Sequence, residues 1–224
     1  MLGFFNASAR RELRLHLSHY GDGLAQLGFF LIIASLFPIA VGPAPEKLSA
    51  LASSILWIAA LLAVAPAFDR LFSDDMHTGH IEQLAASGQP LSVYVLAKSA
   101  VYLLVHGLPL WLLSPVIGGL MGLDGDLYLV MGLSLALGLT GLTLLGSVMA
   151  ALTLGARRAS VLSAILVLPL ALPILIFGIL AIEAQATNMP VRPHLMLLGG
   201  MVLFLLACAP AVAAFGLRSN LEND

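Results

Sequence analysis

Long apolar runs alternate with short polar linkers along the whole chain. A helix needs about 20 apolar residues, at 1.5 Å each, to cross about 30 Å of hydrocarbon. Six runs qualify, at roughly 24–41, 48–68, 94–120, 127–154, 160–182 and 194–217. The linkers hold the turn-forming residues and many of the charges. The pattern therefore predicts an all-α membrane protein, 1–224, with a single domain of six transmembrane helices.

The composition requires lipid as the solvent for much of the surface. Hydrophobic residues make up 60% of the 224 residues, mean hydropathy is +1.01, and charged residues are 10%, against about 25% in an average soluble domain. A soluble fold of this length could not bury so much apolar surface. The net charge of −2 gives no basic excess to displace the counterions of a nucleic acid, so we expect no nucleic-acid partner. Cys208 is the only cysteine, which excludes an internal disulfide.

The distribution of Lys and Arg predicts the orientation, because cytoplasmic loops of membrane proteins have an excess of these residues. With the N-terminus in the cytoplasm, only Lys47 and Arg192 of the ten cations fall outside, and Arg157 and Arg158 are among those inside. The opposite orientation would reverse this imbalance. We therefore predict that both termini are cytoplasmic.

Residues 1–20 favour a helix that lies on the membrane surface. Leu13 and Leu17 repeat at i, i+4, which is the spacing of one helix face. Three arginines near them, at positions 10, 11 and 14, suit anionic lipid headgroups. The alternative is a frayed basic tail that only sets the topology.

The polar segment 69–93 joins the second and third predicted spans and is longer than an ordinary helix connection of about 2–8 residues. Apolar residues recur at i, i+3 and i+4 from Phe68, which predicts short helices along the membrane face. Ser73 is suited to cap a helix, with two carboxylates in its first turn, and Gly79 lets the chain change direction. Apolar residues on one side and acids on the other suit docking into a protein cleft. The alternative is a solvated loop.

Prolines within the spans are candidate bends, because each removes one backbone hydrogen bond and tends to kink its helix. "GLPLWLLSP" at 107–115 and "VLPLALP" at 167–173 share a Leu-Pro-Leu core. The prolines concerned are Pro109, Pro115, Pro169 and Pro173. One interpretation is a pair of bends that open and shut a path or bind a partner. The other is that membrane helices simply tolerate proline.

The fourth span is dense in small residues, which allow close helix contact. They are Gly132, Gly138, Gly141, Gly146 and Ala150. The alternatives are packing within the chain and a homodimer seam.

Several chemistries are missing from the sequence. No charged residue lies near the middle of a span, which disfavours ion-coupled transport and charged selectivity rings. A phosphate-binding loop needs Gly-Lys-Ser/Thr, but Lys47 follows Glu46 and Lys98 follows Ala97. Any ATP must therefore be bound by another polypeptide, and we expect no enzyme activity in this chain. His106 is the one deeply placed histidine, either a haem or metal ligand or a hydrogen-bonded core residue.

The segment "DDMHTGHIEQLAASGQPLSVYVLAK" resembles the acid-rich Gly-x-Leu-Glu-x-Leu region of ABC-2-type exporter permeases. More narrowly, the chain resembles the haem exporter protein B family (CcmB), the permease subunit of the cytochrome c maturation ABC transporter. The matching motifs run almost end to end and include "REL" at 11–13, "FPIAVGP" at 37–43, "RLFSDDMHTGHIEQL" at 70–84, "GLPL" at 107–110 and "ILVLPLALPILIF" at 165–177.

This resemblance implies a set of partners in the bacterial inner (cytoplasmic) membrane. They are a separate ABC ATPase that holds ATP and Mg, a second copy of this chain, haem-handling membrane subunits and a periplasmic haem chaperone. Haem would be handled by the complex, with no cofactor bound by this chain. By position, the ATPase-coupling interface comprises Phe72, Asp74, Asp75, Gly79, Glu82 and Leu84. His80 departs from the family pattern, where Ser or Thr is common, and His106 is not part of the motif.

The implied function is to couple ATP hydrolysis by the partner to haem export or to release of the haem-loaded chaperone. The lack of a convincing haem ligand in the sequence favours release. Two other functions stay open: an ABC-2-type exporter permease for a lipid, drug or polysaccharide, and a structural adaptor that only assembles haem-handling proteins.

Overall fold

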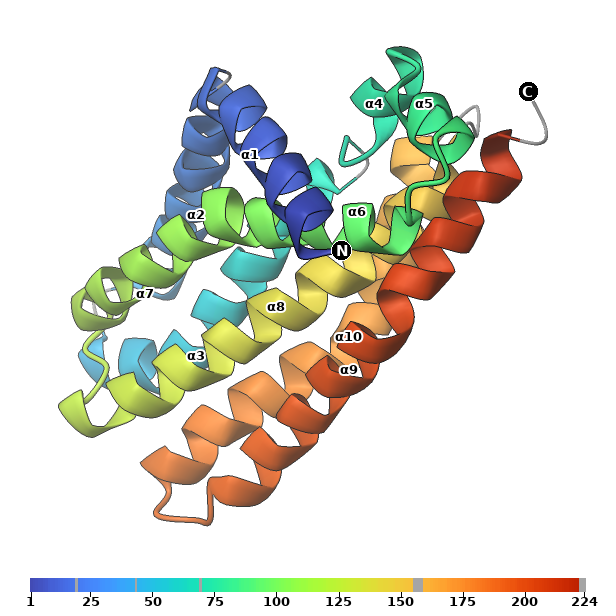
Figure 1. The fold of residues 1–224 in the computed structure, drawn as a ribbon. Coiled ribbons are helices and arrows are strands. Elements are labelled where there is room, and N and C mark those ends of the chain that lie inside the picture. Colours follow the sequence, from blue (N-terminus) through green and yellow to red (C-terminus); the bar gives the residue numbers. More distant parts are fainter. Residues whose placement is uncertain (19, 43, 69, 155–158, 222–224) are drawn as a thin grey trace.

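The computed structural model describes residues 1–18, 20–42, 44–68, 70–154 and 159–221, and within them every regular element is a helix (Figure 1). The α-helices are α1 Leu2–Ser18, α2 Tyr20–Val41, α3 Pro45–Val64, α4 Ser73–His77, α5 His80–Ala86, α6 Leu91–Tyr102, α7 Leu108–Leu120, α8 Tyr128–Thr153, α9 Ala159–Ala186 and α10 Arg192–Leu221. Short 3-10 turns occupy Ala65–Ala67 and Gly125–Leu127, and a π-helical turn occupies Leu103–Gly107.

Six helical stretches of the described chain are long and apolar enough to cross a membrane. They are Gly23–Val41, Pro45–Ala67, Leu91–Leu120, Gly125–Thr153, Leu166–Ala186 and Arg192–Leu221. The third stretch joins α6, the π-helical turn and α7 into one span. These helices confirm the prediction of an all-α protein with six membrane-spanning segments.

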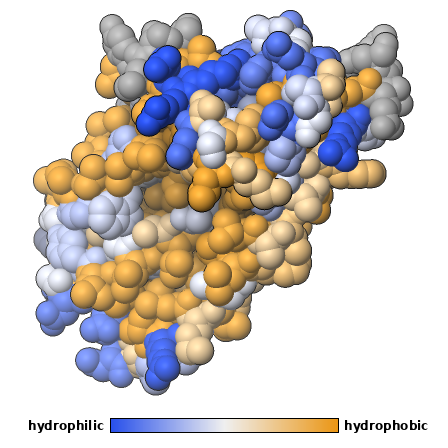
Figure 2. All heavy atoms as spheres, in the orientation of Figure 1, coloured by the Kyte–Doolittle hydropathy of each residue, from blue (hydrophilic) through white to orange (hydrophobic). Residues whose placement is uncertain are grey.

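The two ends of the helical bundle are polar and the region between them is apolar. Figure 1 places α1, α4, α5 and the C-terminus at one end, and the α7–α8 and α9–α10 connections at the other. In Figure 2, hydrophilic atoms gather at both ends around a broad hydrophobic belt. Large side chains such as Leu120, Leu203 and Phe215 are mostly exposed, as expected where lipid is the solvent.

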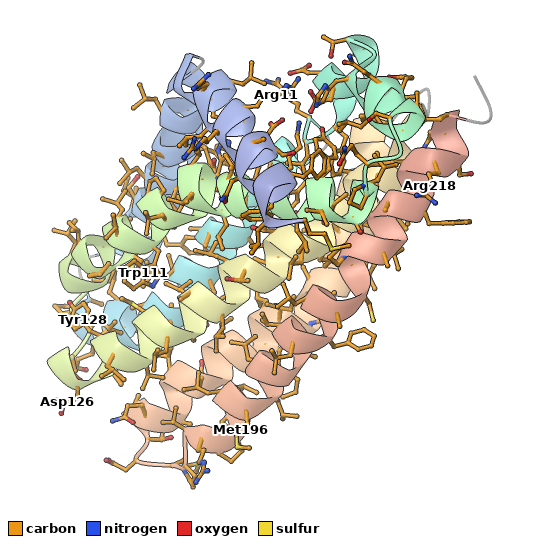
Figure 3. The ribbon with its side chains drawn as sticks, viewed as in Figure 1. Arg11, Trp111, Asp126, Tyr128, Met196 and Arg218 are labelled. Carbon is orange, nitrogen blue, oxygen red and sulfur yellow. The ribbon has the colours of Figure 1, made fainter. Side chains whose placement is uncertain are left out.

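The positive-inside rule assigns the α1, α4 and α5 end to the cytoplasm, which stays a prediction. Arg11 and Arg218 lie toward this end, whereas Asp126 and Met196 lie toward the other (Figure 3). Arg157 and Arg158, which contribute to the predicted orientation, lie outside the described residues.

The glycines of α8 accommodate aromatic side chains from the same chain. Trp57 of α3 is fully buried between Gly138 of α8 and Gly178 of α9. A Cβ atom added at Gly138 would lie 1.9 Å from Trp57 Cη2, and one added at Gly178 would lie 2.0 Å from Cζ2. Phe68 packs against Gly146 in the same way, since a Cβ atom added at Gly146 would lie 2.4 Å from Phe68 Cδ1. Of the two alternatives for these small residues, packing within the chain is the one seen at these positions.

Three of the four candidate bend residues lie inside regular helices, and the fourth does not. Pro115 is inside α7, while Pro169 and Pro173 are inside α9. Pro109 instead stands at the start of α7, two residues after the π-helical turn. The role of all four in conformational coupling stays a prediction.

Candidate functional site

Between Phe68 and Pro90 the chain forms two short helices, α4 and α5, at one end of the bundle (Figure 1). The 3-10 turn Ala65–Ala67 ends the second span, and Phe68 follows it with no exposed surface. Helices α4 and α5 are separated by Gly79, which has φ of 72°. This left-handed conformation costs a glycine little, so the chain turns sharply here. We call residues 68–90 the coupling segment, because they include the predicted ATPase-coupling interface.

The predicted cap of α4 is wrong. Phe72, not Ser73, precedes the helix, and it makes no side-chain capping hydrogen bond. The Ser73 hydroxyl instead donates to the Arg70 carbonyl over 3.3 Å. The preceding turn packs Leu71 and Phe72 into the core, and this tertiary contact fixes where the helix begins. Asp74 and Asp75 do lie in the first turn, where carboxylates are favourable.

The coupling segment has one buried face and one exposed polar face. Phe72 and Ile81 have no exposed surface, and Leu84 is half-buried. Among the predicted interface residues, Asp74 and Glu82 are exposed, whereas Asp75 is only 3% exposed. The predicted set therefore divides into residues that attach the segment to the bundle and residues that a partner could reach.

A cluster of three buried charges and the half-buried Arg11 attaches the coupling segment to α1 and α6. We call it the polar junction; it comprises Arg11, Glu12, Asp75, Tyr94 and Lys98. Arg11 Nη1 lies 2.6 Å from Glu12 Oε1, and Arg11 Nη2 lies 2.8 Å from Asp75 Oδ1. Figure 3 shows Arg11 between α1 and α4. One arginine of the N-terminal helix therefore joins two carboxylates that are far apart in sequence.

Lys98 of α6 completes the polar junction from the membrane side. Its Nζ lies 3.1 Å from Glu12 Oε2 and also contacts Asp75 Oδ2. The Tyr94 hydroxyl donates to the same Asp75 oxygen over 2.5 Å. Lys98 Nζ also lies 5.9 Å from the centre of the Phe72 ring, within range of a cation–π interaction. Two cations therefore balance two carboxylates.

Burial makes this arrangement sensitive to the loss of any one charge. Glu12, Asp75 and Lys98 are each 5% exposed or less. Removing one partner of a buried ion pair costs about 3–5 kcal/mol, because the other charge stays desolvated. The junction thus holds α1, α4 and α6 in one geometry, provided that all four charges are present.

The ionisation of Asp75 reflects these contacts. Burial alone raises the pKa of this carboxyl, but the Lys98 charge and hydrogen bonds from Lys98, Tyr94 and Arg11 outweigh burial and lower the pKa to about 2. Asp75 is therefore a carboxylate throughout the physiological pH range.

The depressed pKa predicts how stability depends on pH. Since the folded-state value of about 2 lies below the ordinary value of 3.8, the contribution of Asp75 is complete above pH 3.8 and is lost as pH falls through 2. We expect the wild-type protein to unfold at a higher temperature than Asp75→Asn in detergent, by a constant margin from pH 8 to 5 and a shrinking margin below pH 4. A margin that does not change between pH 5 and 2.5 would contradict the assignment.

Sequence reasoning anticipated the coupling segment but not its attachment to α1. It assigned Arg11 to lipid headgroups and used Lys98 only as one of the ten cations and in the search for a phosphate-binding loop. The structure turns Arg11 toward Asp75 and buries Glu12 beside Lys98. A single acid within the basic stretch and a single lysine within an apolar run were the available signals.

His106 lies in the π-helical turn and is 6% exposed. Its Nδ1 is 2.5 Å from Gln26 Oε1 of α2, and its ring centre lies 4.5 Å from that of Tyr102 and 5.4 Å from that of His16. These contacts match a hydrogen-bonded core histidine, with a side-chain amide as the partner. Haem ligation by His106 stays a prediction.

These features define a class: an all-helical, multi-pass membrane protein with a polar, two-helix segment tied by buried charges to one end of its bundle. The sequence model of the CcmB protein family matches residues 4–220, and the chain belongs to this family.

Curated relatives match over nearly their whole length. Proteins named "Heme exporter protein B" are 40% identical in Haemophilus influenzae, over 96% of this chain and 97% of theirs, and 39% identical in Pseudomonas aeruginosa, over 97% and 98%. The Escherichia coli K12 protein of the same name is 41% identical over 95% of this chain and 97% of its own.

Proposed function

We propose that this chain is the permease subunit of an ABC transporter that serves haem export in cytochrome c maturation, in the bacterial inner membrane. Similarity to proteins named heme exporter protein B supports the substrate class. The observation that carries the coupling role is the coupling segment itself: acidic outside, apolar inside, and fixed to the bundle by buried charges. ATP and Mg would be bound by a separate ATPase, and a second copy of this chain would face the second ATPase.

The geometry supports a mechanical role for the segment. Asp74 and Glu82 are exposed and would contact the ATPase, while Phe72 and Asp75 face the bundle. A displacement of the segment would pass to α6 through the Asp75–Lys98 pair and to α1 through the Asp75–Arg11 pair. A partner that binds the two resulting arrangements with different affinity would then be released.

Release of a haem-loaded periplasmic chaperone is the form of this function that we favour over passage of haem through the chain. His106, which lies within the third span, has its Nδ1 beside Gln26 and its ring beside Tyr102 and His16. These contacts are those of a core side chain. Haem would then be handled by the partner membrane subunits and the chaperone.

Reversing the charge of Glu82 tests the proposal. Because Glu82 is exposed, Glu82→Arg is expected to leave the thermal unfolding temperature unchanged while the ATPase no longer co-purifies and c-type cytochromes are lost. The measurements are affinity purification from membranes and haem staining of cytochromes. Glu183→Arg is the matched control, since Glu183 is also exposed but lies near the end of α9, far from the coupling segment.

Two outcomes would overturn the proposal. Full ATPase binding and normal cytochromes in Glu82→Arg would show that the exposed acids are not the contact. Normal c-type cytochromes in a strain that lacks the protein would exclude haem export and favour a lipid, drug or polysaccharide exporter.

A further inference from the structure

The third span contains a π-helical turn between α6 and α7. Leu103–Gly107 is π-helical, and the Leu108 N–H donates to the carbonyl of Leu103, five residues earlier. A π-helical turn accommodates one more residue than an α-helical turn, and such turns are frequent at functional sites. Here α6 and α7 are therefore joined by one extra residue within an otherwise continuous span.

The local sequence gives a physical reason for this turn. Pro109 has no N–H, and in a regular α-helix its ring would crowd the carbonyl of Val105. A wider turn before the proline relieves that crowding. Gly107 permits the tight contact that results, since a Cβ atom there would lie 2.7 Å from Leu103 Cδ1.

One side of the π-helical turn is tied to the base of the coupling segment. The Tyr102 hydroxyl donates to the Val64 carbonyl over 3.0 Å. In a regular helix that carbonyl would accept from Phe68, but the Phe68 N–H bonds to Ala65 in the 3-10 turn instead. The Phe68 and Tyr102 rings also pack, with centres 5.4 Å apart. Movement of the segment at Phe68 therefore acts directly on the residue that precedes the π-helical turn.

The other side of the π-helical turn contacts α2 and α1 through an incompletely satisfied polar contact. His106 pairs with Gln26 Oε1, but Gln26 Nε2 is buried with no hydrogen-bond partner among the described residues. A buried amide donor without a partner makes this state less stable than one in which the donor is satisfied. The contact is therefore suited to rearrange when the segment moves.

We propose that the π-helical turn Leu103–Gly107 is the joint of the third span. When the coupling segment moves, Tyr102 moves with the end of α3. The hydrogen bonds of the π-helical turn then rearrange, and α7 tilts relative to α6. Tyr102 is a positioning residue in this scheme, because it acts through the turn and not on the substrate. The inference rests on the proposed function, since it needs the ATPase to move the segment.

Deleting Leu104 tests the joint. Leu104 is 56% exposed, so its loss removes no core contact, and deletion of the one extra residue converts the turn to a regular helix with both flanks in place. The deletion leaves Pro109 to crowd the Val105 carbonyl, so the variant is expected to fold with an unfolding temperature somewhat below that of the wild type and to retain the ATPase. Its yield of c-type cytochrome should fall by about tenfold, the order of the affinity change that coupling between two sites produces.

Deleting Leu112, which is 59% exposed inside α7, is the matched control. Removing a residue from a regular helix rotates everything beyond it by about 100°. This should displace buried Ser114 and Ile117 and prevent folding. Together the two deletions distinguish removal of the extra residue from mere shortening of the span.

Hydrogen exchange on the wild-type complex provides a second measurement that needs no variant. Backbone amides of residues 103–108 are expected to exchange at different rates in the nucleotide-free and ATP-bound complexes. Equal rates, or wild-type cytochrome yield after deletion of Leu104 with the ATPase still bound, would overturn the joint alone. Absence of the ATPase from the wild-type preparation would overturn the proposed function, and the joint with it.

Discussion

Replacement of Lys98 by methionine is expected to prevent stable folding. The variant keeps the length of the side chain but leaves Glu12 and Asp75 buried with only Arg11 to balance them. The cost of about 3–5 kcal/mol for an uncompensated buried charge approaches the whole stability of many domains, about 5–15 kcal/mol. The measurements are the amount of folded protein in membranes and the thermal unfolding temperature in detergent.

A double variant separates charge from packing. Adding Glu12→Gln to Lys98→Met restores neutrality, so it should recover much of the lost stability. Arg14→Met is the control for simple loss of a cation, because Arg14 is exposed on the same helix as Glu12 and its removal should cost at most about 0.5 kcal/mol. A double variant that is no more stable than Lys98→Met would contradict the electrostatic account.

A single methyl group at Gly138 is expected to be nearly as damaging. The new Cβ would lie 1.9 Å from Trp57 Cη2, and the indole cannot withdraw because Gly178 confines it from α9. Overpacking of a core costs about 1–3 kcal/mol and at times more. We expect Gly138→Ala to lower the unfolding temperature and the yield of folded protein.

Gly132→Ala is the matched control on the same helix. Its Cβ would make an ordinary contact of 3.8 Å with Trp111 Cζ2, and alanine favours a helix over glycine by about 1 kcal/mol. This variant should be neutral or stabilising. Trp57→Leu should also make Gly138→Ala tolerable; if the pair behaves additively, the clash with Trp57 is not the cause.

The spans could be predicted because lipid makes hydrophobicity itself the dominant signal. A run such as 127–154 needs no tertiary information to be recognised as a membrane helix. The partners of individual side chains in the polar junction could not be predicted in this way. Arg11 and Asp75 are separated by 64 positions, and they meet where α1 and α4 both contact Lys98 of α6.

Local sequence signals were less reliable for helix starts and helix irregularities, which depend on tertiary contacts. Ser73 has the chemistry of a cap, but burial of Phe72 determines the start of α4. Pro109 indicates that the third span is irregular, yet a proline can produce either a kink or a π-helical turn. The choice depends on the space that Gly107 provides and on the contacts of Tyr102 and His106.

The position of Lys98 in the chain constrains the order of biogenesis. During synthesis Glu12 emerges from the ribosome long before Lys98, so a nascent chain that has inserted only its first two spans holds Arg11 and Glu12 without their later partners. Helix α1 can reach its final site only after the third span has left the insertion machinery. Attachment of α1 to the bundle is thus a late, post-insertion step, and a nascent chain that stalls before residue 98 has no Lys98 to pair with Glu12.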